Sequence, residues 1–511
     1  MTKNLFTRTI IILVIISFLS GLLAALSLPP IGFWEAAFVA NIIFFYIMQS
    51  HKVSKHTTGF LLGFSFAAGQ FSLSLFWTNH FTSFGYVILL IVESLFFAVA
   101  SYISPPNHQV GVIALPALFC LAEYARDNWP FGGLPIGSLI LGQANGPLIN
   151  LARLGGPIAI AFYLYLVSSL IAYALHYISA HRRLATALSL DKLIKTASCI
   201  AVLAGIVTYS FFAPDGGKPS YYVRAVAIQG GGKRGLGYIA KQIAPMMVFT
   251  KTIEETDKII ASRHPQLILW PEDVVSVENS IADSPLTGKV KAEARKFRAT
   301  LIAGFVAPDG PKHFYNKLVA ISSHGKIIGE FEKVHLVPFG EYIPDRSFFS
   351  KFADLSAVPK DAIRGHGSGM LQTGLGKLAL LISYETFFTD RGRSGVNAGG
   401  GILLVSTNTA SYSSSQVPSQ ELAASQIQAV AEGRALLQTA TTGYSAWITP
   451  RGQVLKSSTL GKPDIIYANL GYRNGKTIYD IFGSFPIIAT ATLLFIIAFI
   501  IQYRDRHLEE G

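Results

Sequence analysis

The sequence predicts a polytopic α-helical membrane domain of about eight spans joined to an extracytoplasmic α/β layered domain. The chain has 511 residues, of which 50% are hydrophobic and only 14% are charged. Long apolar segments lie in residues 1–213 and 482–511, whereas shorter strand-like and helix-like runs alternate in residues 214–481. We therefore expect a membrane domain with seven helices, an outer layered domain, and an eighth membrane helix with a cytoplasmic tail.

The charged residues and the cysteines exclude several classes of protein. The formal net charge is +12, but the basic residues form short clusters beside hydrophobic segments. We interpret them as topology signals and contacts with anionic membrane lipid, and we expect no nucleic-acid partner. Both cysteines, Cys120 and Cys199, lie in apolar stretches. The outer domain therefore has no disulfide framework, no cysteine metal site and no thiol nucleophile.

Each membrane span is predicted from an apolar run, because a helix needs about 20 mostly apolar residues to cross a bilayer. Lys3 and Arg8 precede the first run, as in a signal peptide. A second apolar run follows almost directly after Pro29-Pro30, so we expect an uncleaved helix in a hairpin. The predicted spans are residues 10–28, 33–48, 59–77, 86–103, 110–124, 158–178, 194–212 and 482–501.

The short basic loops predict the orientation of the chain. With eight crossings, the basic clusters all fall on one side, which should be cytoplasmic. Residues 214–481 then face outward, as does the loop at residues 125–153, where Trp129-Pro-Phe-Gly interrupts an apolar segment. That loop suits an interfacial or re-entrant segment over a lipid-accessible cavity, or a plain connection. The basic residues are Lys3, Arg8, Lys52, Lys55, Arg182, Arg183, Lys192, Lys195, Arg504 and Arg506.

The outward region mixes strands, helices and hairpins, which predicts an α/β layered domain with an undetermined strand order. It begins with a linker, residues 214–219. Strand-like runs are residues 222–229, 267–270, 300–306, 378–382 and 402–406; helix-like runs are 243–263, 287–297 and 419–434; hairpin pairs are 318–322 with 326–331 and 444–449 with 454–458.

Three polar residues lie at the ends of strand-like runs. Ser383 ends the run at 378–382, and a strand that delivers a small side chain to a sharp turn can present a nucleophile. The alternative is an ordinary turn serine. Glu272 and Lys333 each lie beside another such run. A carboxylate, an amine and a nucleophile could therefore meet at one end of a sheet.

These residue types suit acyl chemistry. Glu272 follows apolar residues, so desolvation should raise its pKa and make it a proton acceptor. Lys333 would favour the carboxylate and hold an oxyanion together with the Tyr384 N–H. Glu341 and Glu385 are supporting carboxylates that could fix Lys333 or move a proton. A structural Glu–Lys ion pair is the alternative, whereas a catalytic Glu272 should lie within hydrogen-bond reach of both Lys333 and Ser383.

The order of these motifs resembles the apolipoprotein N-acyltransferase family, a membrane branch of the nitrilase, or carbon-nitrogen hydrolase, superfamily. The matching motifs are Trp270-Pro-Glu272, Lys333 with His335-Leu-Val-Pro-Phe-Gly-Glu341, and Ser383-Tyr-Glu385. The resemblance covers nearly the whole chain and implies a nitrilase-like domain on the outer face of the bacterial cytoplasmic (inner) membrane.

The family's chemistry gives each matching residue an expected role. A glutamate is the general base, a lysine supports the oxyanion, and a cysteine takes an acyl chain from a phospholipid donor and passes it to the amine of a diacylglyceryl-cysteine lipoprotein. By position, Glu272 and Lys333 match the first two, and Glu341, Tyr384 and Glu385 match neighbouring site residues. No metal or organic cofactor is implied, and we interpret the isolated His335 as structural.

The sequence departs from the family at the nucleophile, where Ser383 replaces cysteine, and in the stretch Asn408-Thr-Ala-Ser-Tyr412. Ser383 could form an oxyester, because Ser–Lys pairs are catalytic elsewhere. Alternatively, the chain is a homologue with lost or altered chemistry, or the serine is a deliberate substitution that traps substrate. The two functional hypotheses are therefore an acyltransferase and a catalytically impaired homologue that binds lipid or lipoprotein without turnover.

Overall fold

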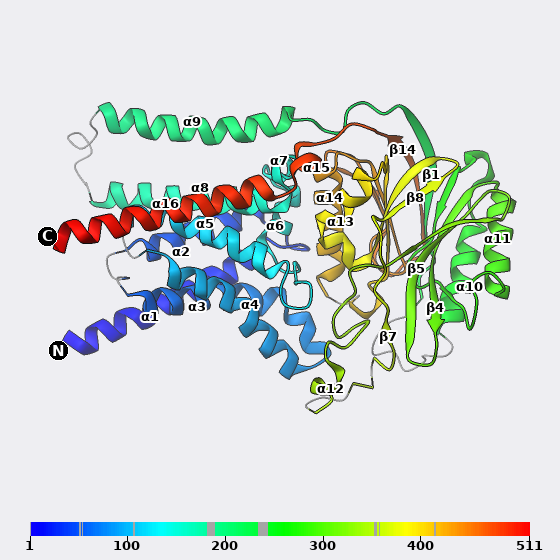
Figure 1. The fold of residues 1–511 in the computed structure, drawn as a ribbon, viewed down its shortest axis with the longest axis horizontal. Helices are drawn as coiled ribbons and strands as arrows, with labels where there is room; N and C mark the ends of the chain where they lie inside the picture. The colour runs from blue at the N-terminus through cyan, green and yellow to red at the C-terminus, as the bar shows by residue number, and fades with distance from the viewer. Residues whose placement is uncertain are drawn as a thin grey trace. The chain divides into compact units, whose positions relative to one another are not determined.

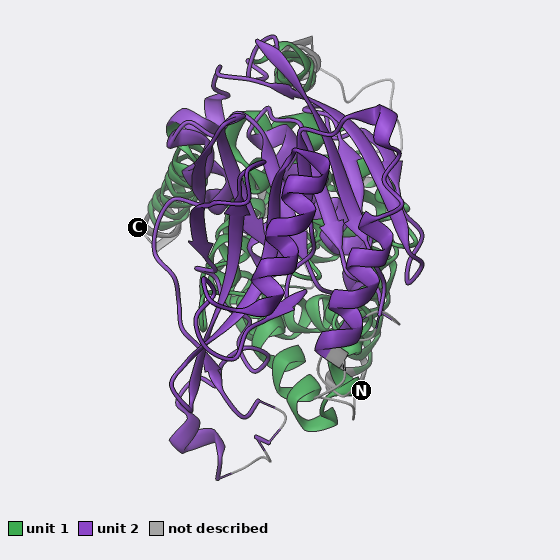
Figure 2. Cartoon of the chain, turned by 90° about the vertical axis from the view of Figure 1, so that its right-hand side faces the viewer, with its two compact units in different colours: residues 1–213, 482–511 green, residues 214–481 purple. Residues whose placement is uncertain are grey.

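The computed structural model describes residues 2–50, 53, 55–105, 108–180, 190–232, 244–351, 355, 356, 358–412 and 415–510. Predictions that involve Lys52, Arg182, Arg183 and Ile243 lie outside these residues. The chain forms two compact units (Figure 2). Unit 1 comprises Met1–Ala213 and Phe482–Gly511, and unit 2 comprises Pro214–Ile481.

Unit 1 is helical, and each of the apolar segments of the sequence folds as a helix (Figure 1). Among the described residues, 4 helical stretches are long and apolar enough to cross a membrane: Arg8–Ala25, Ser83–Ile103, Pro157–Ser179 and Phe485–Arg504. The length and apolar composition of these helices are those of a membrane protein. The principal helices are α1 (Thr2–Ala25), α2 (Trp34–Met48), α3 (His56–Ser74), α4 (Ser83–Ile103), α5 (His108–Arg126), α8 (Pro157–Ala180), α9 (Leu190–Phe212) and α16 (Phe485–Glu510).

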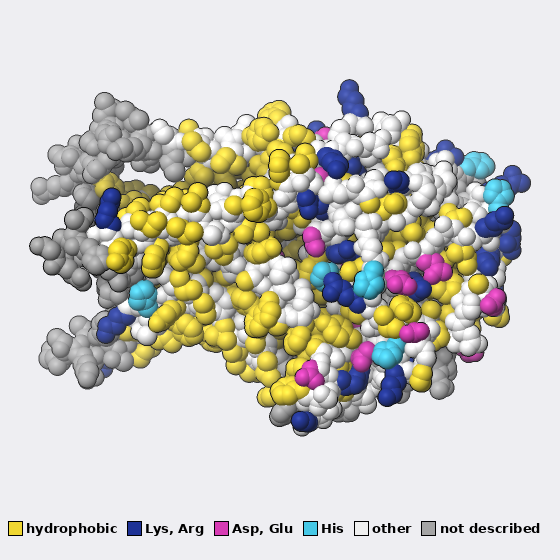
Figure 3. Space-filling model, in the orientation of Figure 1, with side chains coloured by type: hydrophobic (Ala, Val, Ile, Leu, Met, Phe, Trp, Pro, Cys, Tyr) yellow, Lys and Arg dark blue, Asp and Glu magenta, His cyan; other side chains and the backbone are white. Residues whose placement is uncertain are grey.

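Small residues let the helices of unit 1 pack closely, and large apolar residues remain on the outside. A Cβ added at Gly21 would lie 1.9 Å from the Phe66 carbonyl oxygen, so only glycine allows α1 and α3 to approach this closely. In contrast, Ile12 and Leu19 of α1 are more than half exposed. Figure 3 shows hydrophobic side chains over the helices of unit 1 on the face in view. Such a surface is suited to lipid contact.

The loop predicted at residues 125–153 is a packed part of unit 1 rather than a plain connection. It contains the short helices α6 (Leu139–Gly142) and α7 (Ala152–Gly155), and most of its side chains are buried. The buried Arg126 guanidinium donates from Nη2 to the Ile136 carbonyl at 3.0 Å and pairs through Nε with Glu93 Oε2 at 2.8 Å. The first bond holds the loop against the end of α5, and the second joins α5 to α4.

Unit 2 contains two β-sheets. The first has the order β14-β1-β2-β4-β5-β6, with β3 paired to β4 and β7 paired to β5, and the second has the order β13-β12-β11-β10-β9-β8. The strands of the first sheet are β1 (Tyr221–Gln229), β2 (Leu267–Leu269), β3 (Val275–Ser276), β4 (Thr300–Asp309), β5 (His313–Ile321), β6 (Ile327–Glu332), β7 (Asp361–Ala362) and β14 (Asp464–Tyr472). Those of the second are β8 (Met370–Thr373), β9 (Gly376–Ile382), β10 (Leu403–Thr407), β11 (Leu436–Ala440), β12 (Ala446–Ile448) and β13 (Val454–Ser457).

The two sheets pack face to face between layers of helices (Figure 1). Val223 and Ala225 of β1 belong to the core between the sheets, which also includes Leu404 of β10. Val226 lies on the other face of β1, in the core under α10 (Ala244–Thr256) and α11 (Pro285–Phe297). Helices α13 (Thr389–Asn397) and α14 (Val417–Ala431) cover the second sheet. The predicted α/β layered class of this domain is confirmed.

Several element boundaries differ from those predicted. The helix predicted at residues 243–263 ends at Thr256, and a short 3₁₀ turn, Ala261–Arg263, leads into β2. The strands β3, β7, β8, β11 and β14 were not predicted. Strand β14 follows β13 in sequence but pairs antiparallel with β1 in the other sheet, and this pairing is not visible in the local sequence.

Candidate active site

The ends of three strands meet at one edge of unit 2. In the second sheet, β9 and β10 run parallel with Ile382 opposite Ser406, so both chains leave the sheet at the same edge. The Ser406 hydroxyl donates to the Trp270 carbonyl, just after β2 of the first sheet, at 2.9 Å. Residues that directly follow these strands, including Glu272 and Ser383, are therefore brought together.

Ser383 lies at a sharp turn directly after β9. Its φ of +49° is in the left-handed region, which costs a residue other than glycine about 1 kcal/mol or more. It opens the 3₁₀ helix η6 (Ser383–Phe387), and its side chain is half-buried. Strain at such a turn must be held by surrounding contacts, and it is typical of presented nucleophiles.

Glu385 holds this turn against the segment that follows Lys333. Its fully buried Oε1 accepts hydrogen bonds from the Val334 N–H at 2.9 Å and the His335 N–H at 3.2 Å. Its Oε2 accepts from the Ile382 N–H at 2.9 Å. Glu385 thus makes no contact with the Lys333 side chain among the described residues; instead it fixes the distance between the serine turn and the lysine segment.

We expect Glu385→Gln to destabilise the protein by about 1–3 kcal/mol, because the amide would present a donor to a backbone N–H. Thermal unfolding of the full chain in detergent measures the change as a lower Tm. The matched control is Glu330→Gln, since the Glu330 side chain is 37% exposed and pairs only with Lys317 at 3.2 Å. Equal Tm values for the two variants would contradict the structural role of Glu385.

Glu272, Lys333 and Glu341 form a buried network. Lys333 Nζ lies 2.9 Å from Glu272 Oε1 and 2.9 Å from Glu341 Oε1. The side chain of Lys333 is 1% exposed and that of Glu272 is 4% exposed. Close packing positions Glu272, since a Cβ at Gly304 of β4 would lie 2.6 Å from the Glu272 Cα. The predicted Glu–Lys pair therefore forms, with Glu341 as a second partner.

The network sets the protonation of its members. Burial acts to lower the pKa of Lys333, but the charges of Glu272 and Glu341 outweigh it, and the net pKa is raised. Burial raises the pKa of Glu272, and the nearby Lys333 ammonium opposes that rise. Lys333 therefore stays charged, while Glu272 can take up and release a proton near neutral pH.

The free positions in this network point to chemical roles. Lys333 has three N–H donors and, among the described residues, uses two of them on carboxylates, so one remains for a substrate oxygen. Both oxygens of Glu341 are occupied, because Oε2 accepts from the Val337 N–H at 2.8 Å. Glu272 bonds only through Oε1 among the described residues, so its Oε2 is free. Glu341 is held in place, and Glu272 has an oxygen available for proton transfer.

The rings next to the serine turn contact one another. Tyr384 is buried and contacts the Phe388 ring edge-on at 5.0 Å. The His335 ring stacks on the Phe388 ring, with ring centroids 4.0 Å apart. Among the described residues, no group of three or more His, Cys, Asp or Glu side chains could hold a metal ion. The Tyr384 N–H remains a predicted oxyanion donor.

Three buried residues near the site were missed by sequence reasoning: Asn316, Thr407 and Glu421. Asn316 Nδ2 donates to Glu272 Oε1 at 2.8 Å and to Glu341 Oε1 at 2.9 Å. Thr407 Oγ1 lies 3.3 Å from Ser383 Oγ and 2.6 Å from Glu421 Oε1. Thr407 directly follows the strand predicted at residues 402–406, which was a usable signal, whereas Asn316 and Glu421 lie inside a strand and a helix.

Ser383 therefore reaches only part of the predicted constellation. Its side chain bonds to Thr407 and, within the described residues, makes no hydrogen bond to Glu272 or Lys333. The expected contact between Glu272 and Lys333 is present, and the expected one between Glu272 and Ser383 is not. The serine is joined to the network through Glu385 and through the Ser406–Trp270 bond instead.

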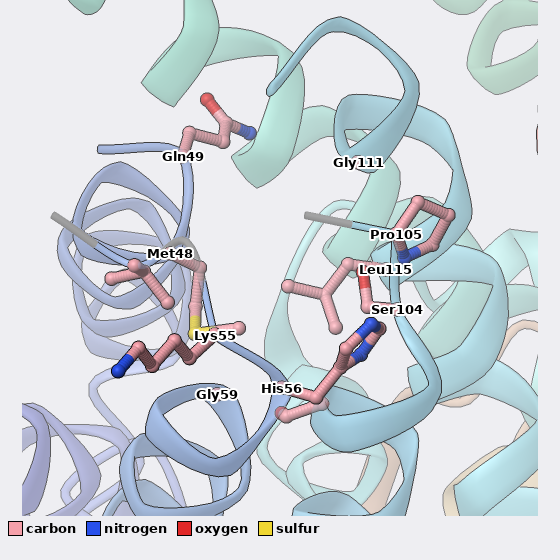
Figure 4. A pocket seen from close by; sticks show the side chains of 11 residues that line it. Met48, Gln49, Lys55, His56, Gly59, Ser104, Pro105, Gly111 and Leu115 are labelled. Carbon is pink, nitrogen blue, oxygen red and sulfur yellow. The ribbon is translucent and has the colours of Figure 1, made fainter. Parts of the chain in front are cut away.

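Two cavities lie away from this site. One, of about 20 Å³ in unit 1, is lined by residues that include Gln49, His56 and Ser104 (Figure 4). It has room for about one water molecule. The other, of about 470 Å³ in unit 2, is lined by residues that include Arg224 and Trp447. Neither contains a predicted site residue.

Comparison with known proteins agrees with this division of the chain. Residues 227–473 match the carbon-nitrogen hydrolase family model, so the sandwich with its Glu–Lys pair and strand-end serine is a nitrilase-like domain. Residues 20–170 match the apolipoprotein N-acyltransferase N-terminal domain. The chain belongs to the apolipoprotein N-acyltransferase family.

Relatives cover nearly the full chain. Apolipoprotein N-acyltransferase of Geobacter metallireducens is 25% identical over 94% of both chains, and that of Haemophilus ducreyi is 25% identical over 99% of both. The Sinorhizobium medicae protein of the same name is 26% identical over 86% of both. Among solved structures, an amidase from Nesterenkonia sp. is 18% identical with a TM-score of 0.35, covering 50% of this chain and 92% of its own.

Proposed function

We propose that this protein transfers an acyl chain from a phospholipid to the N-terminal amine of diacylglyceryl-cysteine in lipoproteins, through an acyl-enzyme intermediate. The relatives that span nearly the whole chain support lipoprotein N-acylation. The observation that carries the assignment is the buried Glu272–Lys333–Glu341 network beside the strained Ser383 turn. A carboxylate with a free oxygen, a fixed cation and a presented hydroxyl are the parts that acyl transfer needs.

In the first half-reaction, Ser383 Oγ attacks the ester carbonyl of the phospholipid, and its proton leaves through the hydrogen bond to Thr407. The electrons of the C=O bond move to oxygen, and the free N–H of Lys333 stabilises this oxyanion together with the Tyr384 N–H. When the oxyanion collapses, the bond to the lysolipid oxygen breaks, and Glu272 supplies the proton that this oxygen takes. Glu272 can carry that proton because burial raises its pKa.

In the second half-reaction, the lipoprotein amine attacks the oxyester on Ser383. Glu272, now ionised, accepts a proton from the amine, and Lys333 again stabilises the oxyanion. Collapse forms the amide and releases the serine oxygen, which regains its proton through the hydrogen bond to Thr407. Glu272 therefore serves as the general base of the transfer, and Glu341 and Asn316 keep it and Lys333 in place.

We also propose the arrangement in the membrane that the sequence predicts. Eight helices would cross the bacterial cytoplasmic membrane, with both termini inside and residues 214–481 on the outer face. The basic loops support this orientation, and the outward location suits a lipoprotein acceptor. A cysteine-reactivity map of single exposed positions in unit 1 and unit 2 from each side of the membrane would test it.

The alternative, a homologue that binds lipid or lipoprotein without turnover, is not favoured. The relatives that match over nearly the full chain are named as acyltransferases. The charged network around Lys333 is also intact.

The test is acyl transfer by the purified full-length protein in detergent with a defined phospholipid and a synthetic diacylglyceryl-cysteine lipopeptide. We expect an N-acylated lipopeptide, and no product from a lipopeptide whose amine is acetylated. Loss of lipid without acylation of the free amine would overturn the transferase assignment and leave hydrolysis.

We expect Glu272→Gln to slow transfer to the amine by about 10²–10⁴-fold, because a positioned general base contributes that much. Because Glu272 also supplies the proton to the lysolipid, the variant is first acylated by a long incubation with phospholipid. Its acyl-enzyme should then persist after lipopeptide is added, and intact-mass analysis over time detects it. Glu278→Gln is the control, since Glu278 is exposed and close in sequence. A variant that clears its acyl group as fast as the parent would rule out Glu272 as the base.

A further inference from the structure

The Ser383 hydroxyl is joined to a carboxylate that the family resemblance does not assign. Thr407 Oγ1 lies between them, 3.3 Å from Ser383 Oγ and 2.6 Å from Glu421 Oε1. Thr407 ends β10, next to the end of β9, and Glu421 is in α14, which covers the second sheet. Three separate elements thus bring a serine, a threonine and a glutamate into one chain of hydrogen bonds.

The number of available protons decides which group donates in each of these two hydrogen bonds. The Thr407 hydroxyl has a single proton, and the short distance to Glu421 shows where an ionised carboxylate draws it. Thr407 Oγ1 then offers only lone pairs to Ser383, so the proton between Ser383 and Thr407 is the one carried by the serine. When Glu421 is ionised and holds the Thr407 proton, the Ser383 hydroxyl is thus the donor to Thr407 Oγ1.

Glu421 does little for stability, which argues for another role. Its side chain is 2% exposed, it has no ion-pair partner among the described residues, and its Oε2 has no hydrogen-bond partner there. A buried carboxylate satisfied by one hydroxyl costs free energy compared with a neutral residue. Burial raises the pKa of Glu421 to about 7, although the Thr407 hydrogen bond and the Lys333 charge oppose that rise. Such a group can accept a proton near neutral pH.

We propose that Glu421 is a positioning residue for the nucleophile, and that it receives a proton through the Thr407 hydroxyl when Ser383 attacks. As the bond between Ser383 Oγ and the donor carbonyl carbon forms, the serine proton passes to Thr407 Oγ1. The proton that Thr407 carried passes to Glu421 Oε1, and the C=O electrons become the oxyanion held by Lys333. In the second half-reaction the same path returns the proton to the departing serine oxygen.

This inference rests on the proposed function and explains how a serine could work here. A serine hydroxyl needs a base to become a nucleophile, whereas a cysteine is partly ionised at neutral pH. The two carboxylates then have separate tasks: Glu421 serves the nucleophile, and Glu272 serves the leaving lysolipid and the amine.

The test compares Glu421→Gln in two backgrounds, the chain with Ser383 and the Ser383→Cys variant, by the rate of acyl-adduct formation with a defined phospholipid. We expect a loss of about 30-fold or more with serine and of less than about 3-fold with cysteine. A merely structural role would slow both backgrounds equally, and that result would overturn the proposal. Acylation of neither protein would instead refute the proposed function, and the inference with it.

Two further readouts separate positioning from folding. Thr407→Val should reproduce the loss and Thr407→Ser should restore most of the rate, while Thr409→Val is a matched control because the buried Thr409 hydroxyl has no hydrogen-bond partner within the described part of the chain. With serine, acylation should rise with pH through about 7, and Glu421→Gln should remove that rise. Lys333 and Tyr412 are the other titratable groups coupled to Glu421, and both are unchanged in this variant. A rise that persists in Glu421→Gln contradicts the proposal.

Discussion

Ser383→Cys is expected to raise the rate of acyl-enzyme formation by about 100-fold, which is a gain of about 2.7 kcal/mol in transition-state stabilisation. A thiol with a pKa of about 8.5 is partly ionised at neutral pH, and the fixed Lys333 charge would favour the thiolate further. The serine hydroxyl must lose its proton during the attack. The same Lys333 and Glu272 groups would serve either nucleophile, because neither bonds to Ser383 in the structure.

The measurement is the time course of the acyl adduct by intact mass, with one phospholipid at saturating concentration. As a control, the rate of lipid uptake into the protein–detergent micelle is measured for both proteins and should be the same. A difference in acylation rate then reflects the chemical step and not the entry of lipid. A cysteine variant no faster than the parent would mean that deprotonation of the nucleophile does not limit acylation, and our account of the serine would be wrong.

Lys333→Met is expected to reduce acyl transfer by about 10³-fold or more, since an oxyanion donor alone is worth about 10²–10³. The same change leaves Glu272 and Glu341 buried without their shared cation. We expect it also to cost about 3–5 kcal/mol of stability, because breaking a buried pair leaves uncompensated charge. Single-turnover acylation and the Tm in detergent measure the two effects separately.

Lys317→Met is the matched control for that variant. Lys317 also pairs with two carboxylates, Glu330 at 3.2 Å and Glu332 at 3.0 Å, but these partners are 37% and 33% exposed, unlike the more deeply buried partners of Lys333. We expect a change in activity of less than about 2-fold and little change in Tm. If Lys333→Met keeps more than a tenth of the parent activity, Lys333 is not the oxyanion donor.

The sequence predicted the parts of the site that depend on local pattern. Ser383 directly follows a buried apolar run, and Glu272 follows another, so each could be recognised as a strand-end residue. The Glu272–Lys333 contact followed from residue type, because an isolated buried charge needs a partner. The choice of Glu341 rather than Glu385 as the second partner of Lys333 did not follow. It depends on how the segment after β6 turns back, with the Val337 N–H fixing Glu341.

The remaining site residues depend on the pairing of distant strands. Asn316 lies inside β5, and its amide faces the site only because β5 pairs with both β4 and β6. Glu421 lies in a helix whose residues are buried almost all round, so its sequence offers no polar face that would mark it. Thr407 meets Ser383 through the parallel register of β9 and β10. The register between strands that are far apart in the sequence cannot be predicted from a short stretch of residues.

In unit 1, the apolar runs of the sequence located the helices but did not show which of their residues face neighbouring helices. Helix α5 carries Glu123 and Arg126, which are fully buried and pair with each other at 3.1 Å. Charged residues of this kind lower the apolarity of a helix although they face its neighbours rather than lipid. Length matters as well, since α2 is apolar but shorter than a spanning stretch, and 4 stretches of the described helices are long and apolar enough to cross a membrane.

The most direct measurement is intact-mass analysis of the purified protein after incubation with phospholipid, for the chain with Ser383 and for Ser383→Ala. Our account predicts an added mass of one acyl chain on the serine protein, released by the lipopeptide amine, and no adduct on the alanine variant. An adduct that persists in Ser383→Ala, or one that appears only after Ser383→Cys, would contradict the serine acyl-enzyme.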